Sequence, residues 1–531
     1  MSSNSNSNAS SNPVAEGVQS ALPQLNSSLA ANVNRVRKTM GESTDIIIRE
    51  VVIGKSREQR MAILYTDGLA DKDAVADFIM ESSMLDMEQS ALTEQLLDGG
   101  SALQMLQSTA LSIGEVKAIT DFEDLLHNLL SGEAIILLDG YAEGIAAGTR
   151  GWKDRGVTEP ATESVIRGPR ESFSETLRTN TALIRRKIKD PNLWLETRQI
   201  GRVTKTDVAV MFIKGIASEK VVKELRVRLD RIDTDAILES GYIEELIQDN
   251  AYTPFPTVYN SERPDVIAAE LLEGKVAILV DGTPFVLIVP ALFVSFLHAA
   301  EDYYHRSDIS TLVRILRYLG VFIALFGPSL YVAITTYHQE MLPTQLLISL
   351  AAQREGIPFP AFIEAIMMEV SFEILREAGL RMPRSVGSAV SIVGTLVIGQ
   401  AAVEAGIVSA AMVIVVATTA IASFVFPAYS LANTIRMLRF LLMGLAVSFG
   451  MFGIIVGVFA ILLHLCSLRS FGVPYLSPFA PMIPEDQKDT LFRLPQWAMT
   501  TRPRLISQRN IEREQSHDLA KPQPPQPKRS S

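Results

Sequence analysis

Long apolar runs are confined to the second half of the chain, and they constrain its fold more than any other feature of the sequence. Five runs begin after residue 282: Thr283–Ala300, Tyr318–Tyr337, Val386–Val403, Ile407–Phe426 and Phe440–Leu465. About 20 apolar residues are needed to cross the roughly 30 Å of hydrocarbon in a bilayer. We therefore predict four or five membrane-spanning helices. The first run is short and contains Pro284 and Pro290, which is typical of an interfacial, re-entrant or kinked segment.

Charge sets the expected orientation of these helices. The segment after Leu468 carries more basic than acidic residues, which is typical of the cytosolic side of a membrane protein. Residues 1–31 have no charged start followed by an apolar core, so we expect no secretory signal and a cytosolic first half. If both ends of the chain lie in the cytosol, the number of membrane crossings must be even. Four crossings satisfy this condition with the first run as an elbow, although Arg436 and Arg439 then lie on the unfavourable side.

Composition and motifs disfavour several classes of function. The net charge of -10 argues against a general nucleic-acid binder, and the single cysteine, Cys466, excludes an internal disulfide or a zinc-type cysteine cluster. The segment VVIGKS ends like a phosphate-binding loop, but Arg49 stands where the first glycine is required. The six histidines show no metal-ligand spacing. We therefore expect no enzyme activity, no metal and no cofactor.

A repeat at a separation of 142 residues organises the first half. The segment LLSGEAIILLDGYAEG begins at Leu129, and LLEGKVAILVDGTPF begins at Leu271. Each copy has the pattern of a helix end, a glycine C-cap, a buried strand and an Asp-Gly turn. A common pattern arising twice by chance is one interpretation, but we favour a duplicated structural unit or a split sheet.

These patterns predict an α/β or α+β cytosolic region of two related subdomains, followed by an α-helical membrane domain with four or five spans. The expected segments are a disordered Ser/Asn-rich tail (residues 1–40), the first subdomain (41–150), the second subdomain with a linker (151–282), the membrane domain (283–468) and a basic, largely disordered cytosolic tail (469–531).

Between the second and third apolar runs, Pro360–Gly379 has helical spacing with apolar residues on one side. Much of the other side is occupied by Glu364, Glu369, Glu373 and Glu377. This pattern is typical of an amphipathic helix at a surface or a membrane interface, so we expect the four carboxylates to be solvated. A funnel for cations is the alternative.

Small and hydroxyl-bearing residues mark the third apolar run. Ser388, Ser391 and Thr395 share one helical stripe with Ile398. Such residues either let helices pack closely or line water, and from the residues alone packing within one subunit is favoured. Glu404, between two apolar runs, is a loop carboxylate at the interface or a charged ring at a pore mouth. Further on, Gly453 and Gly457 form a GxxxG pair, which predicts a helix-packing face.

Several long blocks of the chain are distinctive, and they include LYTDGLADK from Leu64, RGPRESFSETLRTNTALIRRKIKD from Arg167, PFPTVYNSERPD from Pro254 and RMPRSVGSAVSIVGTLVIGQAAVEAGIVS from Arg381. These blocks resemble the A subunits of the GerA-type spore germinant receptors of endospore-forming bacteria. They occur in the same order as in that family and cover most of the chain from about residue 45 to 480. The Ser/Asn-rich start and the Pro-rich end lie outside the resemblance.

The resemblance implies a nutrient-sensing receptor in the inner membrane of the dormant spore, with a transporter-like B subunit and a lipoprotein C subunit as partners. It also implies a multi-pass homo-oligomer with a cytoplasmic N-terminal region, which conducts monovalent cations when the nutrient binds. In such a ring, Ser388, Ser391, Thr395 and Ile398 are the expected pore lining, and Glu404 is the expected charge at the pore mouth. A membrane scaffold, or a transporter-like subunit that relays the signal without conducting ions, is the alternative.

Overall fold

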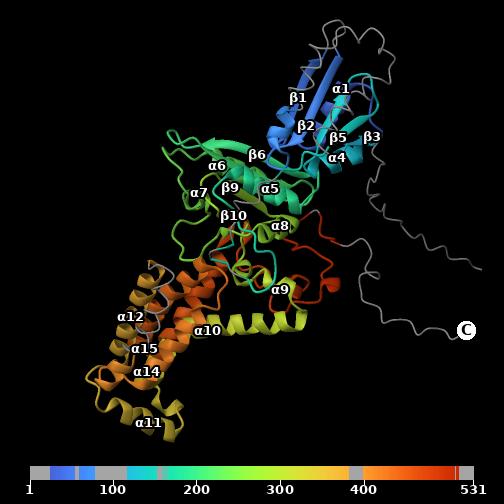
Figure 1. The fold of residues 1–531 in the computed structure, drawn as a ribbon. Helices are drawn as coiled ribbons and strands as arrows, with labels where there is room; N and C mark the ends of the chain where they lie inside the picture. Colours follow the sequence, from blue (N-terminus) through green and yellow to red (C-terminus); the bar gives the residue numbers. More distant parts are fainter. Residues whose placement is uncertain are drawn as a thin grey trace, which may run out of the picture. The chain divides into compact units, whose positions relative to one another are not determined.

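The computed structural model describes residues 24–53, 59–77, 116–151, 159–160, 162–163, 165–381, 399–508 and 510–513. The chain forms two compact units, Met1–Lys153 with Lys189–Pro191, and Asp154–Ile188 with Asn192–Ser531. The first unit contains one mixed α/β subdomain. The second unit contains another, followed by a helical region (Figure 1).

The first subdomain is built on a five-stranded antiparallel sheet with the strand order β1-β2-β4-β5-β3. Its elements are α1 (Leu29–Thr39), β1 (Ile46–Ile53), β2 (Gln59–Thr66), β3 (Val116–Ile119), α4 (Phe122–Leu130), β4 (Ala134–Leu138) and β5 (Gly144–Ala147). Leu29, Val33 and Val36 are spaced along one face of α1 and pack with α4 against the sheet. Every residue of β4 is buried, which explains its continuous apolar sequence.

The second subdomain has a sheet of the same kind, with the strand order β6-β7-β9-β10-β8 and only antiparallel pairs. Its elements are α5 (Leu177–Lys187), β6 (Leu193–Ile200), β7 (Thr206–Ile213), α6 (Glu219–Asp230), α7 (Ser240–Ile247), β8 (Tyr259–Ser261), α8 (Pro264–Leu272), β9 (Val276–Val280) and β10 (Val286–Val289). Buried residues of α5 and α8 form the core on one side of this sheet, and those of α6 and α7 form the core on the other.

The two subdomains are copies of one unit. The bounds of α8, β9 and β10 each lie 142 residues after those of α4, β4 and β5, which is the separation seen in the sequence. Gly132 and Gly274 both have φ near +92°, and a Cβ atom would lie 3.0 Å from the Leu69 carbonyl oxygen in one copy and 2.9 Å from that of Ile216 in the other. Glycine is therefore required at the same point of both copies.

The structure differs from the predicted tails. Helix α1 lies within residues 1–40, which were expected to be disordered, because its apolar residues recur at helical intervals and are buried. Residues 469–508 and 510–513, within the predicted C-terminal tail, form β11 (Arg469–Ser470), β12 (Val473–Pro474), η4 (Asp486–Asp489) and η5 (Gln496–Ala498). Tyr475 and Arg493 are buried there, so this part of the chain is packed into the second unit.

The Thr283–Ala300 run is neither a membrane crossing nor an elbow, contrary to the prediction. It contains β10, which pairs with β8 and β9, and η2 (Phe293–Leu297), which is largely buried. Four consecutive buried apolar residues give the same sequence pattern in an internal strand and in part of a membrane-spanning helix. The helical region therefore begins after this run, not at residue 283.

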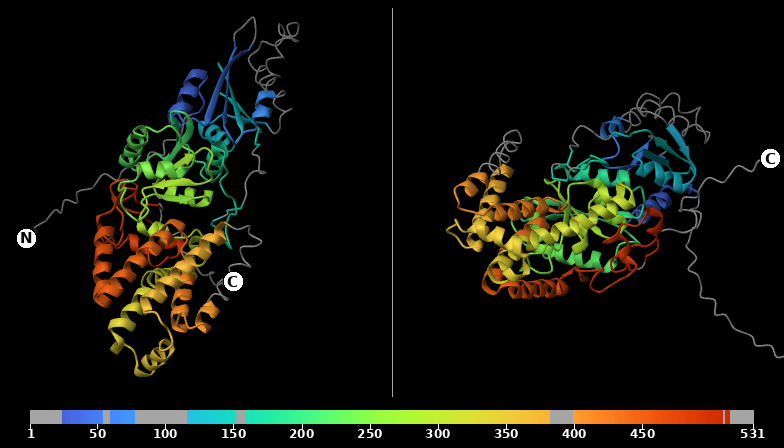
Figure 2. Two further views of the ribbon diagram at one scale, coloured as in Figure 1. Left: turned by 90° about the vertical axis from the view of Figure 1, so that its left-hand side faces the viewer. Right: turned by 90° about the horizontal axis from the view of Figure 1, so that it is seen from below.

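The helical region consists of α9 (Glu301–Tyr304), α10 (Ser307–Tyr337), η3 (Gln339–Met341), α11 (Thr344–Arg354), α12 (Ala361–Arg381), α14 (Ala410–Ser423) and α15 (Tyr429–Ser467). Among the described residues, two helices, α10 and α15, are long and apolar enough to cross a membrane, and α14 is a shorter apolar helix. The predicted number of four or five spans is not confirmed. In Figure 2, α10 (yellow-green) runs obliquely beside the orange helices α14 and α15, against which it packs.

Helix α15 doubles back at Gly450, where the backbone leaves the helical conformation with φ of 60°. The Thr434 hydroxyl donates to the Pro254 carbonyl oxygen at 2.5 Å, and His464 Nε2 lies 2.9 Å from the hydroxyl of the adjacent Thr253. A straight helix would separate the two α15 residues by about 45 Å. The two arms of α15 therefore form a hairpin.

The predicted GxxxG packing face holds this hairpin together. A Cβ atom at Gly453 would lie 2.3 Å from the Leu445 carbonyl oxygen, and one at Gly457 would lie 2.6 Å from the Leu442 side chain. Only glycine permits so close an approach between the arms. At the bend, a Cβ atom on Gly450 would lie 3.2 Å from Tyr337, so the end of α10 and the bend of α15 lie at the same end of the helical region.

Candidate functional site: buried ion pairs of the helical region

The residues of the predicted pore lining, Ser388, Ser391, Thr395 and Ile398, lie outside the described residues. Glu404, the predicted charge at the pore mouth, is exposed and accepts a hydrogen bond at 2.8 Å from the side-chain amide of Gln400. The structure therefore leaves both assignments as hypotheses. It shows instead a set of buried charges that the sequence did not predict.

The buried and exposed sides of helix α12 are the reverse of those predicted from the sequence. Glu364 and Glu369, expected to be solvated, are fully buried, whereas Val370 and Ile374 on the apolar side are 42% and 64% exposed. A buried carboxylate is stable only when a partner compensates for the lost hydration. Each of these two glutamates faces an arginine on another helix.

The central pair joins α12 to the first arm of α15. Glu369 Oε2 accepts a hydrogen bond from Arg439 Nη1 at 2.5 Å. One turn further along, Glu373 Oε2 lies 3.4 Å from Arg436 Nη1 and 3.0 Å from Arg376 Nε. Arg436 and Arg439, which the sequence placed on the unfavourable side of a membrane, are therefore neutralised inside the protein.

Glu364 ties the start of α12 to two other elements. Its Oε2 accepts the backbone N–H of Ser409 at 2.9 Å, just before α14. Its Oε1 lies 3.5 Å from Arg354 Nε at the end of α11. Three carboxylates at successive turns of α12 thus hold α11, α14 and α15 together, and we call Glu364, Glu369, Glu373 and their arginine partners the charge ladder.

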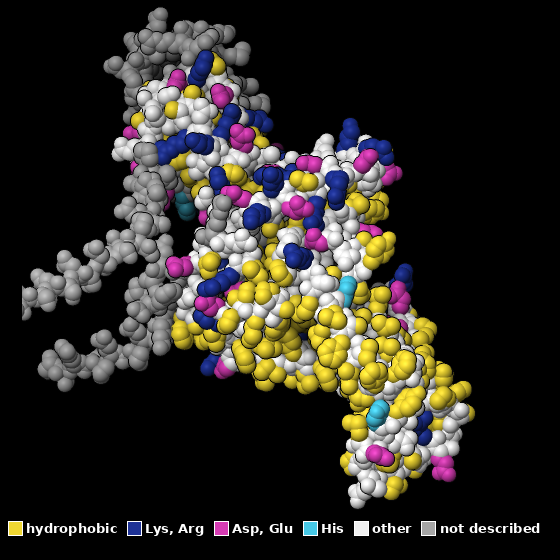
Figure 3. Space-filling view, turned by 180° about the vertical axis from the view of Figure 1, so that it is seen from behind, with side chains coloured by type: hydrophobic (Ala, Val, Ile, Leu, Met, Phe, Trp, Pro, Cys, Tyr) yellow, Lys and Arg dark blue, Asp and Glu magenta, His cyan; other side chains and the backbone are white. Residues whose placement is uncertain are grey.

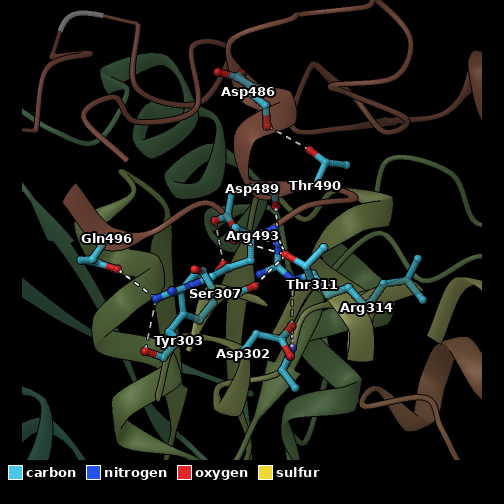
Figure 4. A network of polar contacts seen from close by, with 12 residues as sticks. Asp302, Tyr303, Ser307, Thr311, Arg314, Asp486, Asp489, Thr490, Arg493 and Gln496 are labelled. Carbon is cyan, nitrogen blue, oxygen red and sulfur yellow. Dashed lines mark hydrogen bonds and ion pairs between the residues drawn. The ribbon is translucent and has the colours of Figure 1, made fainter. Parts of the chain in front are cut away.

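A second buried network connects the start of α10 to the segment that follows α15 (Figure 4). Asp302 Oδ2 accepts from Arg314 Nε at 3.0 Å and from Arg317 Nη1 at 2.9 Å. Asp489 accepts from Arg314 Nη1 at 2.8 Å and from the Tyr303 hydroxyl at 2.7 Å. Burial raises the pKa of Asp489, and the charge of Arg314 opposes this shift.

The same segment is held along α10 by Arg493. Its backbone N–H donates to the Thr311 hydroxyl at 3.1 Å, and its Nη2 donates to the side-chain oxygen of Gln496 at 3.3 Å and to the Tyr303 carbonyl oxygen at 3.4 Å. The second network therefore fastens residues 489–496 to the helical region. One signal in the sequence could have indicated it, because Arg314 and Arg317 are one turn apart on an otherwise apolar helix.

The two networks consist of charged side chains that fix the relative positions of the elements they join. Among the described residues, no group of three or more His, Cys, Asp or Glu side chains is placed to hold a metal ion. Both networks link helices that are distant in the sequence. A movement of α12 must therefore break or carry with it the ion pairs to α15.

Comparison with known proteins identifies the family. Residues 34–505 match the model of the Bacillus/Clostridium GerA spore germination protein family. The chain is 51% identical over 490 residues to spore germination protein KA of Bacillus subtilis (strain 168), covering 92% of this chain and 89% of that relative. It is 41% identical to spore germination protein GerLA of Bacillus cereus, covering 91% of this chain and 97% of that relative.

Part of the chain is also similar to a solved structure. It is the crystal structure of the N-terminal domain of the A subunit of the Bacillus megaterium spore germinant receptor GerK3, with 41% identity and a TM-score of 0.41. The alignment covers 51% of this chain and 98% of that domain. By the family match and by its identity to these relatives over most of its length, the chain belongs to the GerA family of spore germination proteins.

Proposed function

We propose that this chain is the A-type subunit of a nutrient-sensing germination receptor and that several copies form a nutrient-gated cation channel in the spore inner membrane. The observation that carries the membrane placement is the inverted orientation of α12, with Glu369 buried and Ile374 exposed. Ionisable residues inside a membrane domain face the protein interior and pair there, while apolar residues face lipid. The hydrophobic lengths of α10 and α15 agree with this placement.

The proposed mechanism uses the charge ladder as the coupling element. A nutrient shifts a closed and an open state only through its different affinity for the two. Helix α12 ends at Arg381, and the proposed pore stripe begins at Ser388, seven residues later. A rearrangement of the ladder would therefore act on the helix that precedes the proposed pore stripe in the sequence. No catalytic step is assigned to the chain.

The proposed assembly includes the transporter-like B subunit and the lipoprotein C subunit, in addition to other copies of this chain. Both ends of the chain are placed in the cytoplasm, with a multi-pass helical region in the lipid. The permeating species are monovalent cations, attracted by Glu404 at the pore mouth. This placement agrees with Pro254 and Thr253 of the second subdomain bonding near both ends of the α15 hairpin, away from its bend.

Planar bilayers containing the purified protein test the channel. Thr395→Ala and Ile398→Ala should alter conductance or open the channel without nutrient, since one removes a pore hydroxyl and the other the apolar constriction. Thr418→Ala is the matched control, because the Thr418 hydroxyl is exposed and bonds the Ile414 carbonyl oxygen of its own helix. Unchanged conductance in both test variants refutes the pore assignment.

A membrane scaffold is the second candidate function. The close packing at Gly453 and Gly457 agrees with this function, because it closes the α15 hairpin of a single chain without a water-filled path. In this case the oligomer would form but conduct no ions in bilayers. Spores with Thr395→Ala would then release potassium like the parent.

A further inference from the structure

The first half of α10 has its charged side against the protein and its apolar side outward. Ser310, Arg314 and Arg317 recur at helical intervals and are buried. The opposite face carries Ile309, Leu312, Leu316 and Leu319, which are each about half exposed. A helix packed on a soluble protein shows the reverse pattern. The outward face of α10 therefore lacks a partner within the described part of the chain.

The segment after α15 extends this apolar face. Arg314 Nη1 donates to the Asp489 carbonyl oxygen at 3.0 Å, and the Arg493 backbone N–H bonds to Thr311, so residues 489–493 run along α10. Their polar groups face the helix, and the large side chains of Leu491 and Phe492 remain exposed, the latter by 55%. Trp497 follows in η5 and is also exposed.

We call the exposed apolar residues of α10 and of the segment bound beside it the α10 apron: Ile309, Leu312, Leu316, Leu319, Leu491, Phe492 and Trp497. Figure 3 shows hydrophobic side chains joined in a broad band over the helical region, with most charged side chains outside it. Apolar patches of this extent on a protein mark a binding surface for protein or membrane.

Two features favour lipid over a protein partner. The apron continues along α10 into Phe322 and the remainder of a helix that is apolar enough to span a membrane. It also carries a tryptophan at the cytosolic end of that helix, and tryptophan is enriched where the hydrocarbon meets the headgroups. Arg314 and Arg317, which would be costly in that layer, are turned away from it and paired with Asp302.

We propose that the α10 apron is a lipid-binding surface and that the chain returns to the bilayer after its last spanning helix, inserting Leu491, Phe492 and Trp497 at the cytosolic interface. The inference rests on the membrane placement proposed above and goes beyond it. In this proposal, part of the predicted cytosolic tail acts as a peripheral membrane anchor. The Asp489 and Arg493 contacts would hold this anchor in register with α10.

Tryptophan fluorescence tests the proposal, because the chain has three tryptophans. The variant Trp152→Phe/Trp194→Phe retains Trp497, and Trp152→Phe/Trp497→Phe retains Trp194, which lies in β6 of the second subdomain, as the matched control. Both full-length proteins are reconstituted into vesicles of phosphatidylglycerol and phosphatidylethanolamine with brominated acyl chains. Trp497 should lose about half of its emission, more with bromine near the headgroup than near the terminal methyl, and Trp194 should lose none.

Three outcomes would overturn the proposal, each for a different reason. Failure of the protein to float with the vesicles overturns the membrane placement itself, and with it the apron. Flotation with unquenched Trp497 overturns the lipid contact alone and leaves the channel proposal standing. Unquenched Trp497 whose emission shifts to the blue as the protein-to-lipid ratio rises assigns the surface to a second copy of the chain.

Discussion

Glu369 contacts Arg439 at 2.5 Å, and neither side chain is exposed. Glu369 Oε1 and two nitrogens of Arg439 have no hydrogen-bond partner among the residues that the structure describes. A buried pair of this kind contributes little net stability, but it makes one relative position of its two helices strongly preferred. This is the property that a switch between two helix arrangements requires.

Removing one member of this pair should destabilise the helical region strongly. Arg439→Met leaves the carboxylate of Glu369 buried without a counter-charge, and a loss of about 3–5 kcal/mol in the free energy of unfolding is expected. The double variant Glu369→Leu/Arg439→Met removes both charges and should recover most of that loss. Thermal unfolding in detergent compares the unchanged protein with the single and the double variant.

Glu377→Gln provides the control on the same helix. Glu377 pairs with Arg381 at 2.7 Å, but both side chains are more than half exposed. An exposed pair of this type is worth at most about 1 kcal/mol. Equal effects of Arg439→Met and Glu377→Gln would contradict the buried ladder.

The sequence predicted the fold of the first half because its information there is local. A glycine C-cap, a buried strand and an Asp-Gly turn recur 142 residues apart, and each depends on neighbouring residues only. The same local logic failed for Thr283–Ala300, since VLIV has the same composition in an internal strand and in a membrane span. Strand pairing with β8 decides between them, and pairing is not visible in a single segment.

The charge ladder could not be predicted for a related reason. The sequence shows four glutamates on one side of Pro360–Gly379, and such a face is normally solvated. Whether it turns inward depends on Arg436 and Arg439, more than 60 residues away. The pore stripe at Ser388, Ser391 and Thr395 stays a prediction, because it lies outside the described residues.

The duplicated Asp-Gly turns should stabilise both subdomains by the same interaction. Asp139 Oδ1 accepts the Leu29 N–H at 2.9 Å, and Asp281 Oδ1 accepts the Leu177 N–H at 2.9 Å, so each aspartate caps the first helix of its own subdomain. Asp281→Ala should lower the free energy of unfolding by about 1 kcal/mol, as for the loss of an N-cap. Hydrogen exchange of the α5 amides measures the local effect. Asp233→Ala, at an exposed site, should leave these amides unchanged.

Alanine substitutions at Gly274 and Gly282 distinguish the cost of backbone strain from the cost of steric overlap. Gly274 and Gly282 both have φ of +92°, but a Cβ atom meets the Ile216 carbonyl oxygen at 2.9 Å only in the first, with nothing within 4 Å in the second. Gly282→Ala should cost about 1 kcal/mol from its backbone conformation. Gly274→Ala should lower the free energy of unfolding by more, because the Ile216 carbonyl oxygen, which follows β7, must also move. Urea unfolding compares the variants, and equal losses would show that Ile216 yields freely.

Glu163 should make the stability of the second unit depend on pH. The Ser261 hydroxyl donates to it at 2.6 Å, and burial raises its pKa from 4.5 to about 7. Because the folded state binds this proton more tightly than the unfolded state, its stabilising effect is complete below pH 4.5 and is lost as the pH rises to about 7. Glu163→Gln should flatten the pH dependence of the urea midpoint in this range. Glu159→Gln, at an exposed pair with Arg170, should retain the slope. A slope that persists in Glu163→Gln would assign the titration to another group.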